Sequence, residues 1–124
     1  TELGKAILIY VNDFDQYPTP EKWCDILIDD CNVPYKTFRC PGAKEGPCNY
    51  ALNKYITDLG TNADTNIVAL FETRPGWNQV GEREILTIEN HLKEGCNVVF
   101  LDGHVEFIKA EDINNLKWKP DKRY

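Results

Sequence analysis

The chain has 124 residues, 42% of them hydrophobic and 27% charged, which is the composition of a globular domain and excludes a long disordered chain. Its 20 acidic and 14 basic residues give a formal net charge of −6, and no Lys/Arg cluster stands out, so nucleic acid is not expected as a partner. No apolar run approaches the roughly 20 residues that span a bilayer. We therefore expect one domain over residues 1–124, with no membrane contact by this segment.

The first two elements are predicted to be helices. The i, i+3, i+4, i+7 spacing of an amphipathic helix is followed by Leu3, Ala6, Ile7 and Tyr10. This helix should end within residues 12–17, ahead of the helix breakers Pro18 and Pro20. Thr19 as N-cap and Pro20 at the first helical position then open a second, short helix, which should end around residues 29–31.

The cysteines predict two disulfides. We expect bridges that close two short loops, Cys40–Cys48 around a Pro/Gly-rich turn and Cys24–Cys31, although five cysteines permit other pairings. Cys96 is expected to stay reduced in an apolar strand, and the bridges indicate an oxidising compartment. Zinc is the rival interpretation. The first four cysteines are separated by six, eight and seven residues without a Cys-x-x-Cys knuckle, so no metal and no cofactor are predicted.

Strand signals appear in the second half of the chain. Residues 66–71 form an apolar run rich in strand formers and predict a buried strand. Residues 84–89 alternate less cleanly and are also predicted as a strand, whereas residues 49–56 fit either a strand or a helix. The sheet is therefore expected to be small.

The clearest local signal is a hairpin near the C-terminus. Asp102-Gly103 separates the apolar runs 98–101 and 104–108, and Asp-Gly is the preferred two-residue type I′ turn because both central residues need positive φ. Residues 110–118, with two acids in the first turn, are predicted to close the chain as a short helix.

Several segments resemble type IV pilins and type II secretion pseudopilins. Residues 12–18 are similar to the end of the long helix in these proteins, and residues 66–72 to their central strand. Their middle segment resembles residues 38–41 and 49–53. His91 followed by residues 95–105 is similar to the C-terminal His-then-Asp-Gly signature of the prepilin-type processing-associated domain, with Asp102 and Gly103 as its last members. Ten residues separate His91 from Asp102 where the family has nine. The family's apolar half-helix and processing site are not part of this sequence, which we expect of a trimmed chain or of a domain released for another task.

This resemblance, together with the predicted elements, leads to an α+β, pilin-like fold in which an N-terminal α-helix packs on a small antiparallel β-sheet with disulfide-pinned loops. It implies a non-enzymatic role in protein assembly or binding in the periplasm or at the cell surface. The partners would be filament subunits or a larger extracytoplasmic complex. The alternative is a soluble accessory or assembly factor that docks on a larger extracytoplasmic enzyme complex.

An enzymatic function is disfavoured, because the sequence has no serine, no haem motif and no phosphate-binding glycine pattern. A small thiol- or metal-dependent enzyme using Cys96, His91 and His104 is the remaining alternative. Turn geometry explains Asp102, and an apolar strand should raise the thiol pKa of Cys96, so neither histidine is expected to sit in a catalytic or metal site.

Calcium is a further alternative for the end of the first helix. Some major pseudopilins bind calcium, and hard oxygen ligands are offered here by Asn12, Asp13 and Asp15. The run lacks the alternating ligands and the terminal bidentate Glu of a dedicated calcium loop. Helix-ending turn chemistry is the favoured interpretation.

The predicted binding surface is the loop of residues 74–81. Loops on a rigid sheet carry recognition, and aromatic side chains concentrate binding energy. Trp77 lies in this Pro/Gly-containing loop, so we expect it to be an exposed anchor, flanked by Arg74 and Asn78.

Overall fold

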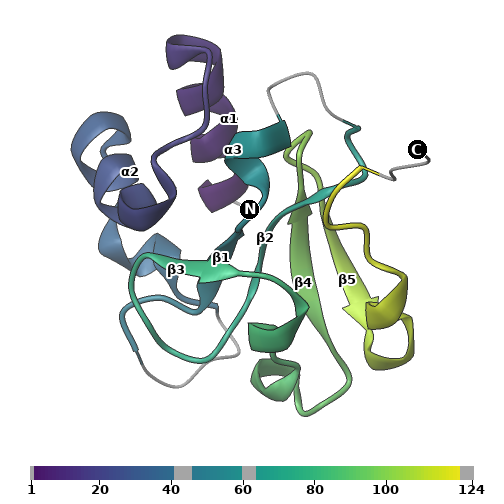
Figure 1. Cartoon of the computed structure of the whole chain (residues 1–124). Helices are drawn as coiled ribbons and strands as arrows, with labels where there is room; N and C mark the ends of the chain where they lie inside the picture. The colour runs from purple at the N-terminus through teal and green to yellow at the C-terminus, as the bar shows by residue number, and fades with distance from the viewer. Residues whose placement is uncertain (1, 41–45, 60–63, 121–124) are drawn as a thin grey trace.

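The computed structural model describes residues 2–40, 46–59 and 64–120, and the sheet and helices are shown in Figure 1. A five-stranded sheet has the strand order β3-β1-β2-β4-β5, and its strands are β1 (Tyr50–Asn53), β2 (Val68–Glu72), β3 (Gln79–Gly81), β4 (Gly95–Phe100) and β5 (Val105–Lys109). All neighbours are antiparallel except β1 and β3, which are parallel. The expected α+β fold with an N-terminal helix is confirmed, but the sheet is mixed.

The two predicted N-terminal helices are present. Helix α1 (Glu2–Phe14) buries the four predicted apolar positions, and Asp15 ends it in a left-handed conformation with φ 56°. Helix α2 (Trp23–Cys31) follows a 3₁₀ turn that begins at Pro20, and its C-cap Asn32 is left-handed. Figure 1 shows α1 and α2 beside each other on the side of the sheet where β3 and β1 lie. None of the helices in the described ranges has the length and apolar character needed to cross a bilayer.

Side chains alternate between two cores, one on each face of the sheet. The core on the face covered by α1 and α2 contains Leu3, Trp23, Leu27, Phe38, Leu52 and Leu70. The core on the other face contains Phe71, Leu86, Cys96, Val98 and Ile113. β2 is buried along its whole length because it is the central strand and is covered on both faces.

Two predicted elements differ from the observed ones, and the structure resolves one region that the sequence left ambiguous. Residues 84–89 are not a strand: two 3₁₀ turns, η3 (Arg83–Ile85) and η4 (Glu89–His91), occupy this region, and only Leu86 forms an isolated bridge, to Thr73. The closing helix is a 3₁₀ helix, η5 (Ala110–Asn115), and the chain after it is extended. The ambiguous residues 49–56 contain β1 and the start of a short helix, α3 (Ile56–Leu59).

The predicted Cys40–Cys48 and Cys24–Cys31 disulfides are not present: all five cysteines lie in the described residues and none is bonded to another. The two sulfurs of the first pair face different partners, Cys40 towards Glu72 and Cys48 towards Cys24. The middle of the loop expected to be pinned, residues 41–45, lies outside the described residues.

The predicted hairpin is confirmed, but its turn is of another kind. Phe100 and His104 close a three-residue loop, in which Phe100 O accepts from the backbone N–H of Gly103 at 2.8 Å. Gly103 alone among the three loop residues has positive φ, 87°, so the loop is a type I turn completed by a left-handed glycine. A side chain at Gly103 would also overlap Leu8 Cδ1 of α1.

Gly103→Val is expected to lower the free energy of unfolding by more than about 1 kcal/mol, because a branched side chain is strained at this φ and meets Leu8. Urea denaturation measures the change. The same substitution in a Leu8→Ala background should recover only the steric part of the loss. Equal stability of Gly103→Val and the parent chain would contradict the assigned turn.

Candidate functional site

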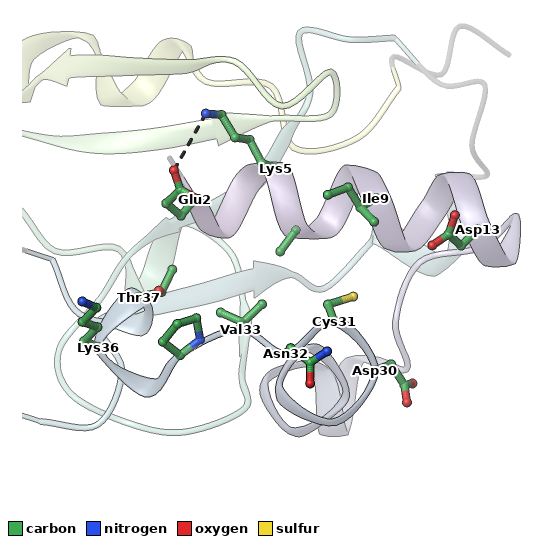
Figure 2. Close-up of a pocket in the computed structure, with 12 residues that line it drawn as sticks. Glu2, Lys5, Ile9, Asp13, Asp30, Cys31, Asn32, Val33, Lys36 and Thr37 are labelled. Carbon is green, nitrogen blue, oxygen red and sulfur yellow. Dashed lines mark ion pairs between the residues drawn. The ribbon is translucent and has the colours of Figure 1, made fainter.

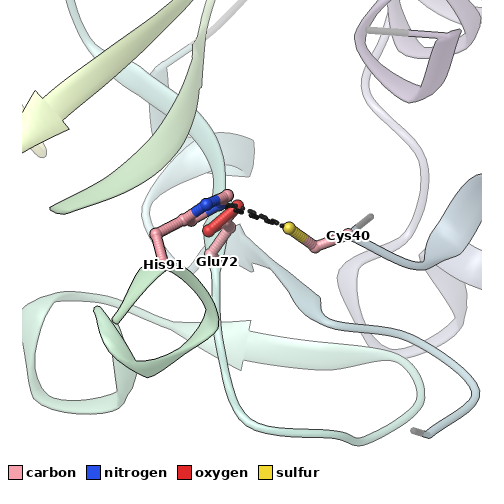
Figure 3. Close-up of side chains that lie close together, drawn as sticks. All are labelled: Cys40, Glu72 and His91. Atoms are coloured by element: carbon pink, nitrogen blue, oxygen red, sulfur yellow. Dashed lines mark hydrogen bonds and ion pairs between the residues drawn. The ribbon is translucent and has the colours of Figure 1, made fainter. Parts of the chain in front are cut away.

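Three chemically reactive side chains converge at the end of the central strand, and we call them the Cys–Glu–His cluster: Cys40, Glu72 and His91 (Figure 3). Cys40 Sγ donates to Glu72 Oε1 at 3.0 Å, and His91 Nε2 lies 2.8 Å from the same oxygen. Cys40 Sγ and His91 Nε2 are 3.3 Å apart. The three ligand-type atoms therefore form a closed triangle of sulfur, oxygen and nitrogen.

The sheet register places Glu72. It is the last residue of β2 and pairs with Tyr50 of β1. The β2–β4 register pairs Phe71 with Val98, so the next position sets Glu72 beside Asn97, and Asn97 pairs in turn with Phe107 of β5. These four side chains form one row across the sheet, on the face that the helices cover.

Local structure on either side of this row brings in the other two members. Cys40 follows the 3₁₀ turn η2 (Tyr35–Phe38), and its backbone N–H donates to Asn49 Oδ1 at 3.3 Å. His91 ends η4, and its ring meets the Phe107 ring edge-on, with the centroids 5.4 Å apart. Each cluster member thus comes from a separate segment.

The cluster is buried, and the two carboxylate oxygens of Glu72 differ in their hydrogen bonding. Glu72 is fully buried, and its Oε1 accepts a hydrogen bond from Asn97 Nδ2 at 3.2 Å in addition to its contacts with Cys40 and His91. Its Oε2 is buried as well and has no hydrogen-bond partner in residues 2–40, 46–59 and 64–120. Burial and the neighbouring Cys40 and Glu72 raise the pKa of Tyr50. The His91 side chain is 25% exposed and is the cluster's contact with the surface.

The arrangement favours binding of a ligand over nucleophilic attack on a substrate. A thiol beside an imidazole is a nucleophile when a substrate can reach it. Cys40 is only 1% exposed, so its sulfur is not presented to a substrate. A buried set of sulfur, nitrogen and carboxylate oxygen is instead the donor set of a transition-metal ligand site.

A second feature is a groove of about 650 Å³ between α1 and the segment that joins α2 to η2 (Figure 2). Its apolar lining includes Ala6 and Ile9 of α1 and Val33 and Pro34 opposite. Charged side chains stand around it: Glu2, Lys5, Asp13, Asp30 and Lys36. Ile9 is 56% exposed, so an apolar side chain of α1 is open to a partner there.

Two of the three predicted binding residues of the loop, Trp77 and Asn78, contact α2. Trp77 is half-buried: its Nε1 donates to Asp25 Oδ1 at 2.9 Å, and its ring packs on Phe38. Asn78 Oδ1 accepts from the backbone N–H of Cys24 at 2.8 Å, which supplies a cap to the first turn of α2. Arg74 is exposed and pairs with Glu89. The role of this loop in binding stays a prediction.

The predicted signature residues do not form one site. Asp102 contacts the ring of His104 and accepts from its backbone N–H, whereas His91 belongs to the Cys–Glu–His cluster. Cys96 faces the opposite core, and burial raises its pKa to about 12, so the sulfur beside His91 is that of Cys40. The disfavoured enzymatic alternative combined His91 with Cys96, whereas the structure places Cys40 beside His91.

Two more buried thiols form a pair of their own. Cys24 and Cys48 are both fully buried, and the hydrogen bond between them, together with burial, raises the pKa of Cys24. Cys48 Sγ also accepts from the backbone N–H of Tyr50 at 3.4 Å. A pair of contacting thiols is the geometry from which a disulfide can form.

Comparison of the chain with protein-family models, with curated proteins and with solved structures finds no match. The resemblance to pilin-like proteins stays a prediction.

The His104 pKa should be above the ordinary value of about 6.5, because Asp102 first and Glu106 second accept from the ring. The folded-state pKa is raised, so this contribution to stability is complete below the unfolded pKa and is lost as the pH rises through the folded one. An NMR titration measures it, with His91→Gln used to assign the two rings. Asp102→Asn should lower the titration midpoint of His104 more than Glu106→Gln does. An unchanged His104 midpoint in Asp102→Asn would contradict Asp102 as the main cause of the raised pKa.

Cys24 and Cys48 are expected to form the first disulfide when the chain refolds in a glutathione redox buffer. Their two thiols would give two electrons and two protons to oxidised glutathione. Peptide mapping without reduction identifies the bridge, and Cys48→Ala should leave Cys24 reduced. A dominant Cys40–Cys48 or Cys24–Cys31 peptide would reinstate the pairing expected from loop lengths.

Proposed function

We propose that this chain is a non-catalytic, extracytoplasmic domain that joins a protein assembly through the surface of its helical layer. The observation that carries the proposal is the open groove between α1 and the α2–η2 segment, with Ile9 exposed on one wall. Tyr35 extends the same surface: it is 68% exposed and stacks on Trp77, with ring centroids 5.8 Å apart. We call the groove and these two rings the helical-layer surface.

The composition of this surface suits a protein partner. Apolar centres with a charged rim and exposed aromatic rings are typical of protein interfaces. Glu2 and Asp13 both line the groove and are 11 residues apart on α1, which corresponds to about 17 Å at roughly 1.5 Å per residue. A helix of about three turns with one apolar stripe fits that length.

Charge along the groove suggests how such a helix would lie. Asp13 and Asp30 stand at one end in Figure 2, whereas Glu2 and Lys36 stand at the other. A partner helix with a basic residue near the Asp13 end would match the two acids there. We take an amphipathic helix of a partner protein as the occupant.

Two settings are compatible with this function. In one, the chain is a pilin-like or pseudopilin-like subunit, and another filament subunit supplies the helix. In the other, it is a soluble accessory factor that docks on a larger extracytoplasmic complex. The resemblance of residues 12–18 and 95–105 to pilin-like proteins supports the first setting and the extracytoplasmic location. The burial of Cys40 supports a role without catalysis.

A photo-crosslinker placed at Lys5, on the groove rim, should yield one defined adduct in native extract, whereas one at the exposed Glu111 should not. Adding Ile9→Asp to the Lys5 probe should reduce the adduct at least about tenfold, because a charge is buried in the apolar centre. Leu92→Asp, an equally drastic change at an 87% exposed position outside the groove, is the matched control. Mass spectrometry must place the adduct on a helical segment of the partner.

The circular dichroism spectrum of the Ile9→Asp variant should be that of the parent chain, since the side chain is exposed. Equal adduct yields from the Lys5 and Glu111 probes, or loss of the adduct in Leu92→Asp as well, would exclude the helical-layer surface as the binding site.

A further inference from the structure

We propose that the Cys–Glu–His cluster is a binding site for one divalent transition-metal ion of the Zn²⁺ type, with Cys40 Sγ, Glu72 and His91 Nε2 as ligands. This proposal does not rest on the proposed binding function. The cysteine spacing predicted no metal, whereas these three ligands come from distant segments of the chain.

The distances fit an ion after a small opening of the triangle. Metal–ligand distances of roughly 2.0–2.3 Å in a tetrahedral site place the ligand atoms about 3.3–3.6 Å apart. The three observed separations are 2.8, 3.0 and 3.3 Å. Movements of a few tenths of an ångström in side chains therefore make room for the ion, without a change in the sheet.

The second carboxylate oxygen is an independent sign of a ligand. Three groups crowd onto Glu72 Oε1, while the buried Oε2 has no hydrogen-bond partner among the residues described. Leaving a buried acceptor unpaired destabilises the folded state. A cation coordinated through both oxygens of Glu72 would satisfy the unpaired one and relieve the crowding at the other.

Charge balance favours a dication. A Cys40 thiolate and a Glu72 carboxylate carry two negative charges, and a neutral His91 adds none, so a divalent ion makes the buried site neutral. Buried charges are stable when they are compensated in this way. On binding, the ion replaces the thiol proton of Cys40, which leaves to solvent.

The ligand types select the metal class. Thiolate and imidazole suit Zn²⁺ and Co²⁺, whereas Ca²⁺ and Mg²⁺ require oxygen ligands. Asn97 borders the site, with its Nδ2 3.2 Å from Glu72 Oε1 and 3.3 Å from His91 Nε2. The His91 side chain is 25% exposed, so it is the side of the site that faces solvent.

The test is a Co²⁺ titration of the full chain, reduced and stripped of metal with a chelator. We expect one Co²⁺ per chain, with thiolate-to-cobalt charge-transfer absorption and the visible bands of a tetrahedral ion. Zn²⁺ should displace Co²⁺ and raise the thermal midpoint by several degrees, whereas Ca²⁺ and Mg²⁺ should do neither.

Variants assign the ligands. Cys40→Ser should abolish the charge-transfer band, and His91→Gln and Glu72→Gln should each weaken Co²⁺ binding at least about tenfold. The matched controls are Cys31→Ser and His104→Gln, which should bind like the parent chain. His91 is partly exposed, so His91→Gln decides the matter if either buried substitution fails to fold. The proposal is overturned if the parent chain shows no band, if binding survives in His91→Gln, or if Cys31→Ser loses it.

Discussion

The burial of one carboxylate, that of Glu72, constrains the rest of this structure. Glu72 ends the central strand, where both faces of the sheet are covered, and a carboxylate in such a place is stable only when other groups compensate its charge. Its side chain accepts from Cys40 and Asn97 and contacts His91, and its backbone carbonyl accepts from Thr87 at 3.0 Å. Four residues from different parts of the chain are thereby held around this one residue.

The sequence predicted the elements whose signals are local. The apolar spacing in α1, the strand-forming run before Glu72 and the left-handed Gly103 can each be recognised from a few neighbouring residues. β3 and the two 3₁₀ turns could not be predicted this way. β3 has three residues and exists because it pairs with β1. Residues 84–89 follow the surface of the core that contains Phe71 and Leu86. The cluster was missed because Cys40 and Glu72 are 32 positions apart and Glu72 and His91 are 19 apart. The available signal was an acid at the end of a fully apolar strand.

Backbone geometry explains how His91 is directed at Glu72. Immediately after His91, Leu92 and Lys93 are both left-handed, with φ 55° and 67°. Such conformations cost of order 1 kcal/mol or more each for residues with a side chain, so the surrounding structure must impose them. A tight left-handed turn takes up chain length before β4 begins, and it leaves His91 directed at the sheet.

The two candidate sites share one segment. Residues 34, 36 and 37 form part of one wall of the groove, and the same segment continues through Phe38 to Cys40. Trp77 adds a second connection, because it packs on Phe38 and hydrogen-bonds to Asp25 at the start of α2. Anything that fixes Cys40 against Glu72 therefore restricts the wall that a partner would contact. A wall that is already ordered loses less conformational entropy when it binds, so an ion at the cluster and a helix in the groove would each favour the other.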